Sequence, residues 1–241
     1  MIDHVEQPDM VVPTRDAVLG RRARRAYVEA EFRAFVGDPG FSCLAGKGVV
    51  RGGGCQLEVF GRLGSARSAR LLANGLAAFV DATPADGSGL HAFAAIFPTD
   101  APSSEDEFER RLWTQIQLLH DRDAPDAGWD PHVSDDPDDL HFSFSFAGRA
   151  MFVVGLHPAS SRLSRRFRWP ALVFNPRAQF ERLRAEGRFE RLRETVRERE
   201  IALQGTLNPN LADFGESSEA RQYSGRVAEP GWQCPFHRNT P

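Results

Sequence analysis

The sequence of 241 residues predicts a single α+β domain in which helices cover a mostly antiparallel sheet. Phe142, Phe144 and Phe146 alternate with serines, which is the pattern of a half-buried strand. The tight turn 147–149 then leads into a second apolar run over 151–156, and such a hairpin requires antiparallel pairing. Hydrophobic residues make up 41% of the chain, which is enough apolar material to offset the entropy of ordering.

Each element is expected from its own local pattern. Residues 1–15 are expected to form a loose N-terminal tail, and 16–241 a single domain. Ser104 and Glu107 form a capping box, which predicts the start of a helix with an apolar stripe at helical spacing. Residues 46–54 are glycine-rich and are expected to be flexible. The other helices are expected over 16–36, 66–80, 177–185 and 189–203, and the other strands over 90–97 and 171–174.

Two further segments stand out by composition. Residues 121–139 are acidic and proline-rich and are expected to form a long solvated loop. The sequence FERLR occurs at Phe180 and again at Phe189, which we interpret as a local echo within helices, not as a repeat architecture. The segment 205–241 is rich in Gly, Asn, Ser and Pro but carries distinctive polar residues, which is unusual for a linker.

Charge and composition exclude several function classes. The formal net charge of −3 gives no electrostatic reason to expect nucleic acid or an anionic membrane as a partner. Lys47 is the only lysine, so a Schiff-base mechanism would depend on that residue. No phosphate-binding glycine motif and no G-x-G-x-x-G are present, so no nucleotide-cofactor site is expected. Acidic residues near the N-terminus and an odd set of three cysteines favour a cytoplasmic protein.

Three clusters are candidates for chemistry. In the first, His157 ends a buried strand, and Arg162, Arg165 and Arg166 follow within a short stretch, which suits a metal-bound imidazole beside anion-binding guanidiniums. A strand-end histidine beside a solvated basic turn is the alternative. The second is His120, near the end of the 104-onward helix, either as a metal ligand or as an ordinary helix-end histidine.

The third cluster is the polar C-terminal stretch 208–236. Cys234 and His237 have a spacing compatible with zinc ligands, but no second close pair accompanies them. A nucleophilic triad is not supported either, because no nucleophile elbow is present.

Several motifs together resemble a known family: FSC at 41–43, LW…LLHDRD over 112–123, FSFSFAGRAMFVVGLHPASSR over 142–162, LVFNP at 172–176, and the C-terminal stretch. They resemble the YqcI/YcgG family, and most closely its branch with the guanitoxin-pathway N-hydroxylase and the cycloserine-pathway arginine hydroxylase. The resemblance implies a haem-dependent monooxygenase that N-hydroxylates a small guanidine- or amine-bearing metabolite. It also implies dioxygen as co-substrate and, because the chain has no flavin or nicotinamide motif, a separate electron-donor reductase.

The resemblance implies roles for individual residues. Haem b would take His157 as its axial ligand, with His120 and Cys43 as alternatives, since a thiolate also suits haem hydroxylases. The propionate partners would be Arg162, Arg165 and Arg166, and the apolar slot would include Phe144 and Phe152.

Substrate roles would fall in the C-terminal stretch. Glu216 and Glu219 would receive the substrate cation, Arg221 or Arg226 its carboxylate, and Tyr223 would order a bound oxygen or water. Two alternatives stay open: a haem or small-ligand binding protein without turnover, and a metal-independent structural protein.

Overall fold

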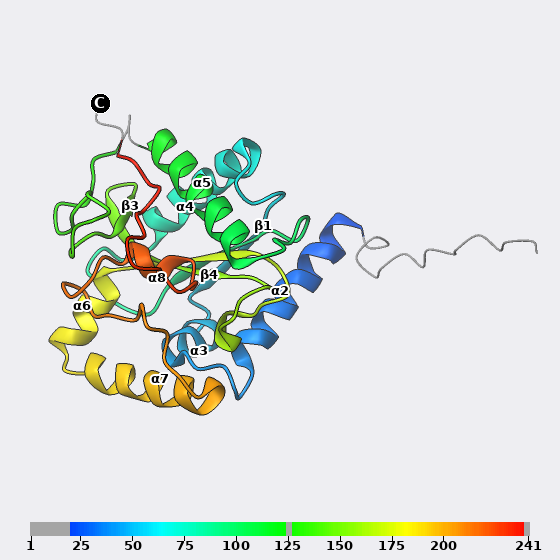
Figure 1. Cartoon of the computed structure of the whole chain (residues 1–241). Helices are drawn as coiled ribbons and strands as arrows, with labels where there is room; N and C mark the ends of the chain where they lie inside the picture. The colour runs from blue at the N-terminus through cyan, green and yellow to red at the C-terminus, as the bar shows by residue number, and fades with distance from the viewer. Residues whose placement is uncertain (1–19, 124–126, 239–241) are drawn as a thin grey trace, which may run out of the picture.

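The computed structural model describes residues 20–123 and 127–238, and its centre is a five-stranded sheet with the order β1-β2-β5-β4-β3 (Figure 1). β1 and β2 pair in parallel, and the other three pairings are antiparallel. The predicted α+β class with a mostly antiparallel sheet is therefore confirmed. The strands are β1 (Cys55–Val59), β2 (Ala92–Ile96), β3 (Phe144–Phe146), β4 (Arg149–Leu156) and β5 (Ala171–Pro176).

Helices cover both faces of this sheet (Figure 1). Helices α4 (Ala66–Ala82) and α5 (Glu105–Asp123) pack on one face, and α2 (Arg21–Gly37) and α3 (Leu44–Arg51) pack on the other. β2 contributes to both layers: Phe93 and Ala95 belong to the α4/α5 core, whereas Ala92, Ala94 and Ile96 belong to the α2/α3 core. A strand that is buried on both faces reads as a continuous apolar run, as AFAAI does.

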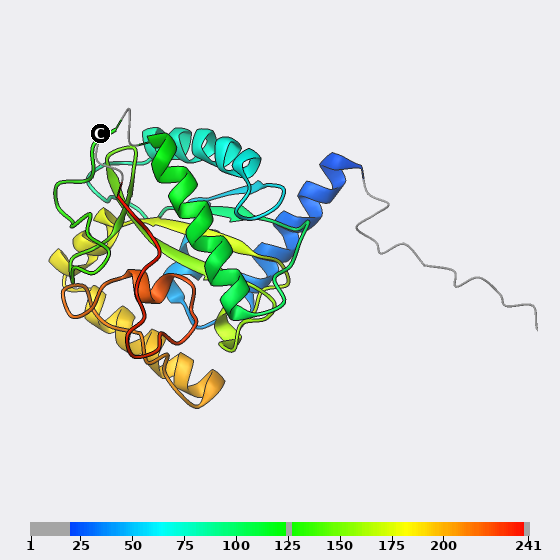
Figure 2. The ribbon, with the colours of Figure 1, turned by 45° about the horizontal axis from the view of Figure 1, so that its top comes forward.

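The C-terminal third adds two helices at one side and a long return segment. Helices α6 (Ala178–Ala185) and α7 (Phe189–Gln204) follow β5 and meet at Gly187, whose φ of 67° suits glycine. The chain then passes through the short helix α8 (Ala220–Tyr223) and runs beside α5, where His237 N–H donates to Gln117 Oε1 at 2.9 Å (Figure 2). The return segment is thus part of the core, since Tyr223 and Phe236 are buried in the α4/α5 layer.

The structure corrects one prediction about local structure. Residues 46–54, expected to be flexible, mostly belong to α3, and β1 begins at Cys55. α3 forms despite its glycines because the Cys43 side chain caps its N-terminus and Val49 is buried against the sheet. The capping box also differs in part: Ser104 Oγ accepts from Glu107 N–H, but the Glu107 carboxylate accepts from Ser103 instead.

The expected tail at 1–15 lies outside the described residues. No helix in the described ranges is long and apolar enough to cross a membrane.

Candidate functional site

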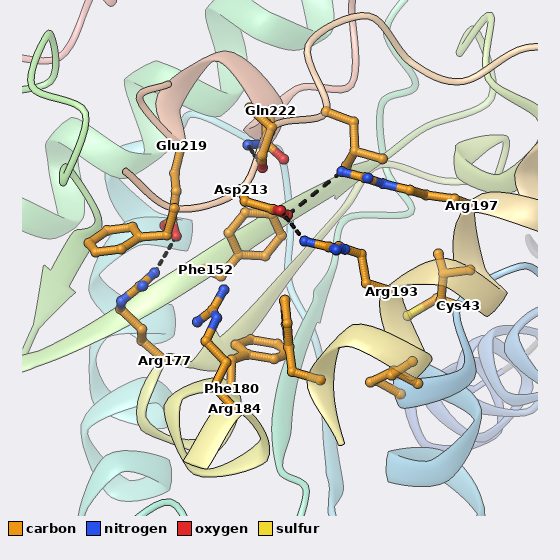
Figure 3. A pocket seen from close by; sticks show the side chains of 17 residues that line it. Cys43, Phe152, Arg177, Phe180, Arg184, Arg193, Arg197, Asp213, Glu219 and Gln222 are labelled. Atoms are coloured by element: carbon orange, nitrogen blue, oxygen red, sulfur yellow. Dashed lines mark hydrogen bonds and ion pairs between the residues drawn. The ribbon is translucent and has the colours of Figure 1, made fainter. Parts of the chain in front are cut away.

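A pocket of about 190 Å³ lies between β4, the α6–α7 hairpin and the segment 211–222 (Figure 3). Its walls are largely apolar, and its charged residues are mostly arginines. The apolar lining is formed by Phe152, Phe180, Phe189, Leu192, Val196, Leu211, Ala212 and Phe214. Because the volume is below the roughly 300–1,000 Å³ of typical ligand pockets, a large ligand would require one wall to move outward.

At one end of the pocket, Arg177 and Glu219 form a buried ion pair (Figure 3). Arg177 also pairs with Glu181 at 2.7 Å, and its guanidinium carbon lies 3.3 Å from the centre of the Phe214 ring. Burial raises the pKa of the Glu219 carboxyl, while Arg177, with a smaller contribution from the Ser143 hydroxyl, opposes that rise. Arg177 therefore occupies one oxygen of the carboxylate that the sequence analysis assigned to the substrate.

Two arginines of α7 surround a second acid of the lining. Arg193 Nη1 and Arg197 Nη2 both face Asp213, the latter at 3.7 Å from Oδ1 (Figure 3). The Nε atoms of both arginines are buried and have no hydrogen-bond partner among the residues that the structure describes. These guanidiniums therefore keep donors that no described residue uses.

The lining carries a surplus of positive charge. Four arginines (Arg177, Arg184, Arg193 and Arg197) stand against two acids of the lining (Asp213 and Glu219). Glu181, outside the lining, pairs with Arg177 and Arg184, so the surplus is one positive charge. Excess charge of one sign is costly in an apolar surrounding, so the composition of the pocket favours a ligand that is largely apolar and carries negative charge.

Cys43 lines the same pocket, and Figure 3 places it away from the Arg177–Glu219 pair. Its Sγ accepts the Gly46 N–H at 3.3 Å, at the N-terminus of α3. Burial raises the pKa of this thiol, and the N–H groups of the helix N-terminus and the Arg165 guanidinium act in the opposite direction. A cation bound at the sulfur would favour the thiolate further.

His157, the first predicted ligand, lies outside the pocket. Its side chain is fully buried and stacks on the Phe108 ring of α5, with 4.1 Å between the ring centres. Neither ring nitrogen has a hydrogen-bond partner within residues 20–123 and 127–238. Burial, assisted by nearby Arg165, lowers the pKa of His157 to about 4, so the imidazole is neutral at pH 7.

The three predicted propionate partners also lie apart from the pocket, and each has protein partners. Arg162 is buried and pairs with Glu200 at 3.0 Å. Arg165 donates to the carbonyl oxygens of Gln222 and Tyr223. Arg166 donates to the Ser160 carbonyl and lines a separate hollow beside α2. The structure thus does not bring His157 and these arginines into one ligand pocket.

Of the predicted aromatic residues, Phe152 lines the pocket and the other two do not. Tyr223 is fully buried in the α4/α5 core, where its hydroxyl accepts the Phe144 N–H at 2.9 Å and lies 3.4 Å from the Met151 carbonyl. Burial raises the pKa of Tyr223 well above its usual value. Tyr223 and Phe144 therefore connect α8 to β3 and do not face the cavity.

The remaining predicted residues are placed elsewhere. Glu216 is exposed and accepts the Asp213 N–H, and Arg221 lies against Trp232, outside the pocket. Arg226 pairs with Glu109 at 2.8 Å. His120 is buried against the rings of Trp129 and Phe236, and burial lowers its pKa.

The spacing of Cys234 and His237 is compatible with zinc, but no further ligand lies close to this pair among the described residues. No group of three His, Cys, Asp or Glu side chains close enough to hold a metal ion occurs in the described part of the chain. All three cysteines are free.

Several pocket residues were not predicted as site residues. Arg184 and Arg193, with Phe180 and Phe189, come from the two FERLR segments, whose repetition was noticed but given no function. Asp213 and Phe214 lie in the C-terminal stretch 208–236, within which neither was assigned a role, and Arg197 has no distinguishing sequence pattern.

Comparison with known proteins gives a family but no described activity. A family model described as the YqcI/YcgG family matches residues 32–237. The chain is 31% identical over 137 residues to a protein of Bacillus subtilis (strain 168) that is named "Uncharacterized protein YqcI". That alignment covers 54% of this chain and 53% of the relative, so the chain spans about half the length of the curated relative it matches. No solved structure matches the chain.

Proposed function

The chain belongs to the YqcI/YcgG family, and from this premise we propose that it is a haem-dependent monooxygenase that N-hydroxylates a small guanidine- or amine-bearing metabolite. The observation that carries the proposal is the composition of one pocket: apolar and aromatic walls, a surplus of positive charge, and the free thiol of Cys43. Haem b requires an axial ligand, an apolar slot and partners for two propionates. The residues of this pocket match all three requirements in kind.

In this proposal Cys43 replaces His157 as the favoured axial ligand. Cys43 faces the cavity, whereas His157 is stacked on Phe108 outside it. A thiolate-ligated haem supplies oxygen activation, because the thiolate donates electron density that favours O–O cleavage. The cap at the α3 N-terminus holds the sulfur in place, and the cap and Arg165 partly oppose the rise in the pKa of this thiol that burial causes.

The other residues of the pocket would bind, orient and exclude water. Phe152 and Phe180, which meet edge-to-face at 6.4 Å between ring centres, form one apolar wall. Arg177 holds the Glu219 carboxylate in a fixed position beside Phe214. Glu219 remains the acid we assign to the substrate cation, with the correction that Arg177 already takes one of its oxygens. Dioxygen and a separate electron-donor reductase remain the proposed partners.

A second candidate function is ligand binding without turnover. Two residues that the sequence predicted as catalytic, Tyr223 and Glu219, already bond to other protein groups, and this favours binding without turnover. The two functions predict the same haem pocket and differ only in whether substrate drives the consumption of electrons.

The test is haem reconstitution of the wild type and of three variants. We expect the wild type to bind one haem per chain, with a Soret band and the absorption features of a thiolate-ligated iron. These thiolate features should be lost in Cys43→Ser. They should be retained in His157→Phe and in Cys55→Ser, which changes a control thiol outside the pocket. A histidine-type spectrum in the wild type that persists in Cys43→Ser and is lost in His157→Phe would return the ligand role to His157. Absence of haem binding in the wild type would overturn the proposal.

Turnover is measured separately. With an added reductase, the N-hydroxylase is expected to consume NADPH faster when arginine or an amine analogue is added, and to form an N-hydroxylated product. Stable haem binding without substrate-dependent consumption would support the binding protein.

A further inference from the structure

The repeated sequence FERLR forms two equivalent parts of the pocket rim. Each copy places a phenylalanine and an arginine four residues apart, and residues at i and i+4 share one face of a helix. Phe180 and Arg184 line the pocket from α6, and Phe189 and Arg193 line it from α7. The two helices meet at Gly187, so both copies face the same cavity (Figure 3).

The two copies are also in contact with each other. The guanidinium carbon of Arg184 in the first copy lies 3.9 Å from the ring centre of Phe189 in the second. Phe180 in turn packs edge-to-face on Phe152 of β4. Phe180 therefore extends the aromatic wall that Phe152 begins, and Arg184 joins the first copy to Phe189 of the second.

Both arginines keep N–H donors that no residue in the described ranges uses. Arg184 Nη1 donates to Glu181 at 2.9 Å, and Arg193 Nη1 pairs with Asp213. A guanidinium has five N–H donors in a planar fork that suits carboxylates. Both side chains are a little more than a quarter exposed, so a ligand in the pocket can reach them.

The arginine at the third position of each copy does not line the pocket. Arg182 turns away from the pocket and pairs with Asp86 and Glu186 on the surface. Arg191, its counterpart in the second copy, is exposed and does not line the pocket. Only the arginine at the fifth position of each copy is directed to the cavity.

We propose that the two FERLR segments form a clamp for a flat apolar ligand with two carboxylates, in which Arg184 binds one carboxylate and Arg193 the other. The inference rests on the proposed function, because haem is a flat apolar ligand with two carboxylates. In this proposal the propionates bind to arginines of α6 and α7. They do not bind to Arg162, Arg165 and Arg166, which have protein partners outside the pocket.

The experiment compares porphyrins that differ only in charge or metal. Apo-protein is titrated with haemin, with metal-free protoporphyrin IX and with protoporphyrin IX dimethyl ester, whose carboxylates are blocked. We expect Arg184→Gln and Arg193→Gln each to weaken protoporphyrin IX binding by about tenfold to a hundredfold, as for the loss of a charged hydrogen bond. Binding of the dimethyl ester should not change in either variant.

Arg182→Gln and Arg191→Gln are the matched controls, and both should bind all three porphyrins as the wild type does. Circular dichroism verifies that each variant is folded. We expect Arg184→Gln and Arg193→Gln to fold, because both arginine side chains are partly exposed.

The outcomes separate the two proposals. Equal affinities of wild type, Arg184→Gln and Arg193→Gln for haemin would overturn the clamp and leave the haem enzyme standing. The expected charge dependence with protoporphyrin IX, with a haemin spectrum that shows neither thiolate nor histidine ligation by the protein, would support the clamp and contradict the proposed function. Failure of the wild type to bind any of the three porphyrins would overturn both.

Discussion

At the scale of single residues, His157 is a neutral aromatic core residue whose two ring nitrogens have no described partner. Its pKa in the folded chain is about 4, below the ordinary value of about 6.5 for an unfolded chain. Between these two values the unfolded chain binds a proton that the folded chain does not. The stability from His157 is therefore complete above about pH 6.5 and is lost as the pH falls towards 4, by about 3 kcal/mol in total.

We predict that His157→Phe removes this part of the pH dependence, because a phenyl ring can stack on Phe108 but cannot be protonated. Urea unfolding of the apo-protein at pH 7.5 and pH 5 measures the free energy of unfolding of both chains. The wild type should lose more stability than the variant over this interval. An identical loss in both would show that His157 does not titrate as its burial requires.

At the scale of elements, α7 is a wall of the pocket, and none of its own side chains is fully buried. Its C-terminal half is attached by polar contacts: Glu200 accepts from Ser42 and Arg162, and Arg199 donates to the Pro39 carbonyl at 2.6 Å. Elements with few buried apolar contacts open at low free-energy cost. α7 is thus the wall best suited to move outward for a ligand larger than the present cavity.

We predict that Glu200→Gln loosens α7, because it weakens the bond to Ser42 and leaves the buried Arg162 without its anion. Amide hydrogen exchange within α7 should accelerate by about tenfold or more, and trypsin should cleave more rapidly at its arginines. Glu198→Gln, a change at an exposed position of the same helix, is the control. Unchanged exchange in Glu200→Gln would mean that other contacts hold α7.

Sequence patterns predicted the elements with strong periodicity and missed those that depend on tertiary contacts. The hairpin of β3 and β4, the capped start of α5 and both helices of the FERLR segments follow from local spacing. α3 did not, because the low helix propensity of its two glycines, Gly46 and Gly48, is outweighed by a cysteine cap and a buried valine. Propensity is a weak guide wherever packing supplies the larger energy.

At the scale of the whole molecule, the pocket is assembled from four separate segments: the start of α3, β4, the α6–α7 hairpin and 211–222. The sequence singled out Cys43, Phe152 and Glu219 among these, but it carries no signal for which segments meet. His157 was favoured because a histidine after a buried strand is typical of a site, whereas its neighbours in space, Phe108 and Arg165, decide its role. The charge balance of the pocket likewise depends on pairings such as Arg177–Glu219.

The position of β5 at the middle of the sheet has a consequence for synthesis of the chain on the ribosome. β5 lies between β2 and β4, pairing Ala95 with Leu172 on one side and Val153 with Phe174 on the other, although it is the last strand to be translated. Until residue 171 emerges, β2 and β4 each present an unpaired edge, and contacts of such long sequence separation form slowly. We therefore expect nascent chains arrested before β5 to be digested rapidly by protease, and chains extended past α8 to resist; resistance of the shorter chains would show that the two halves of the sheet fold without their central strand.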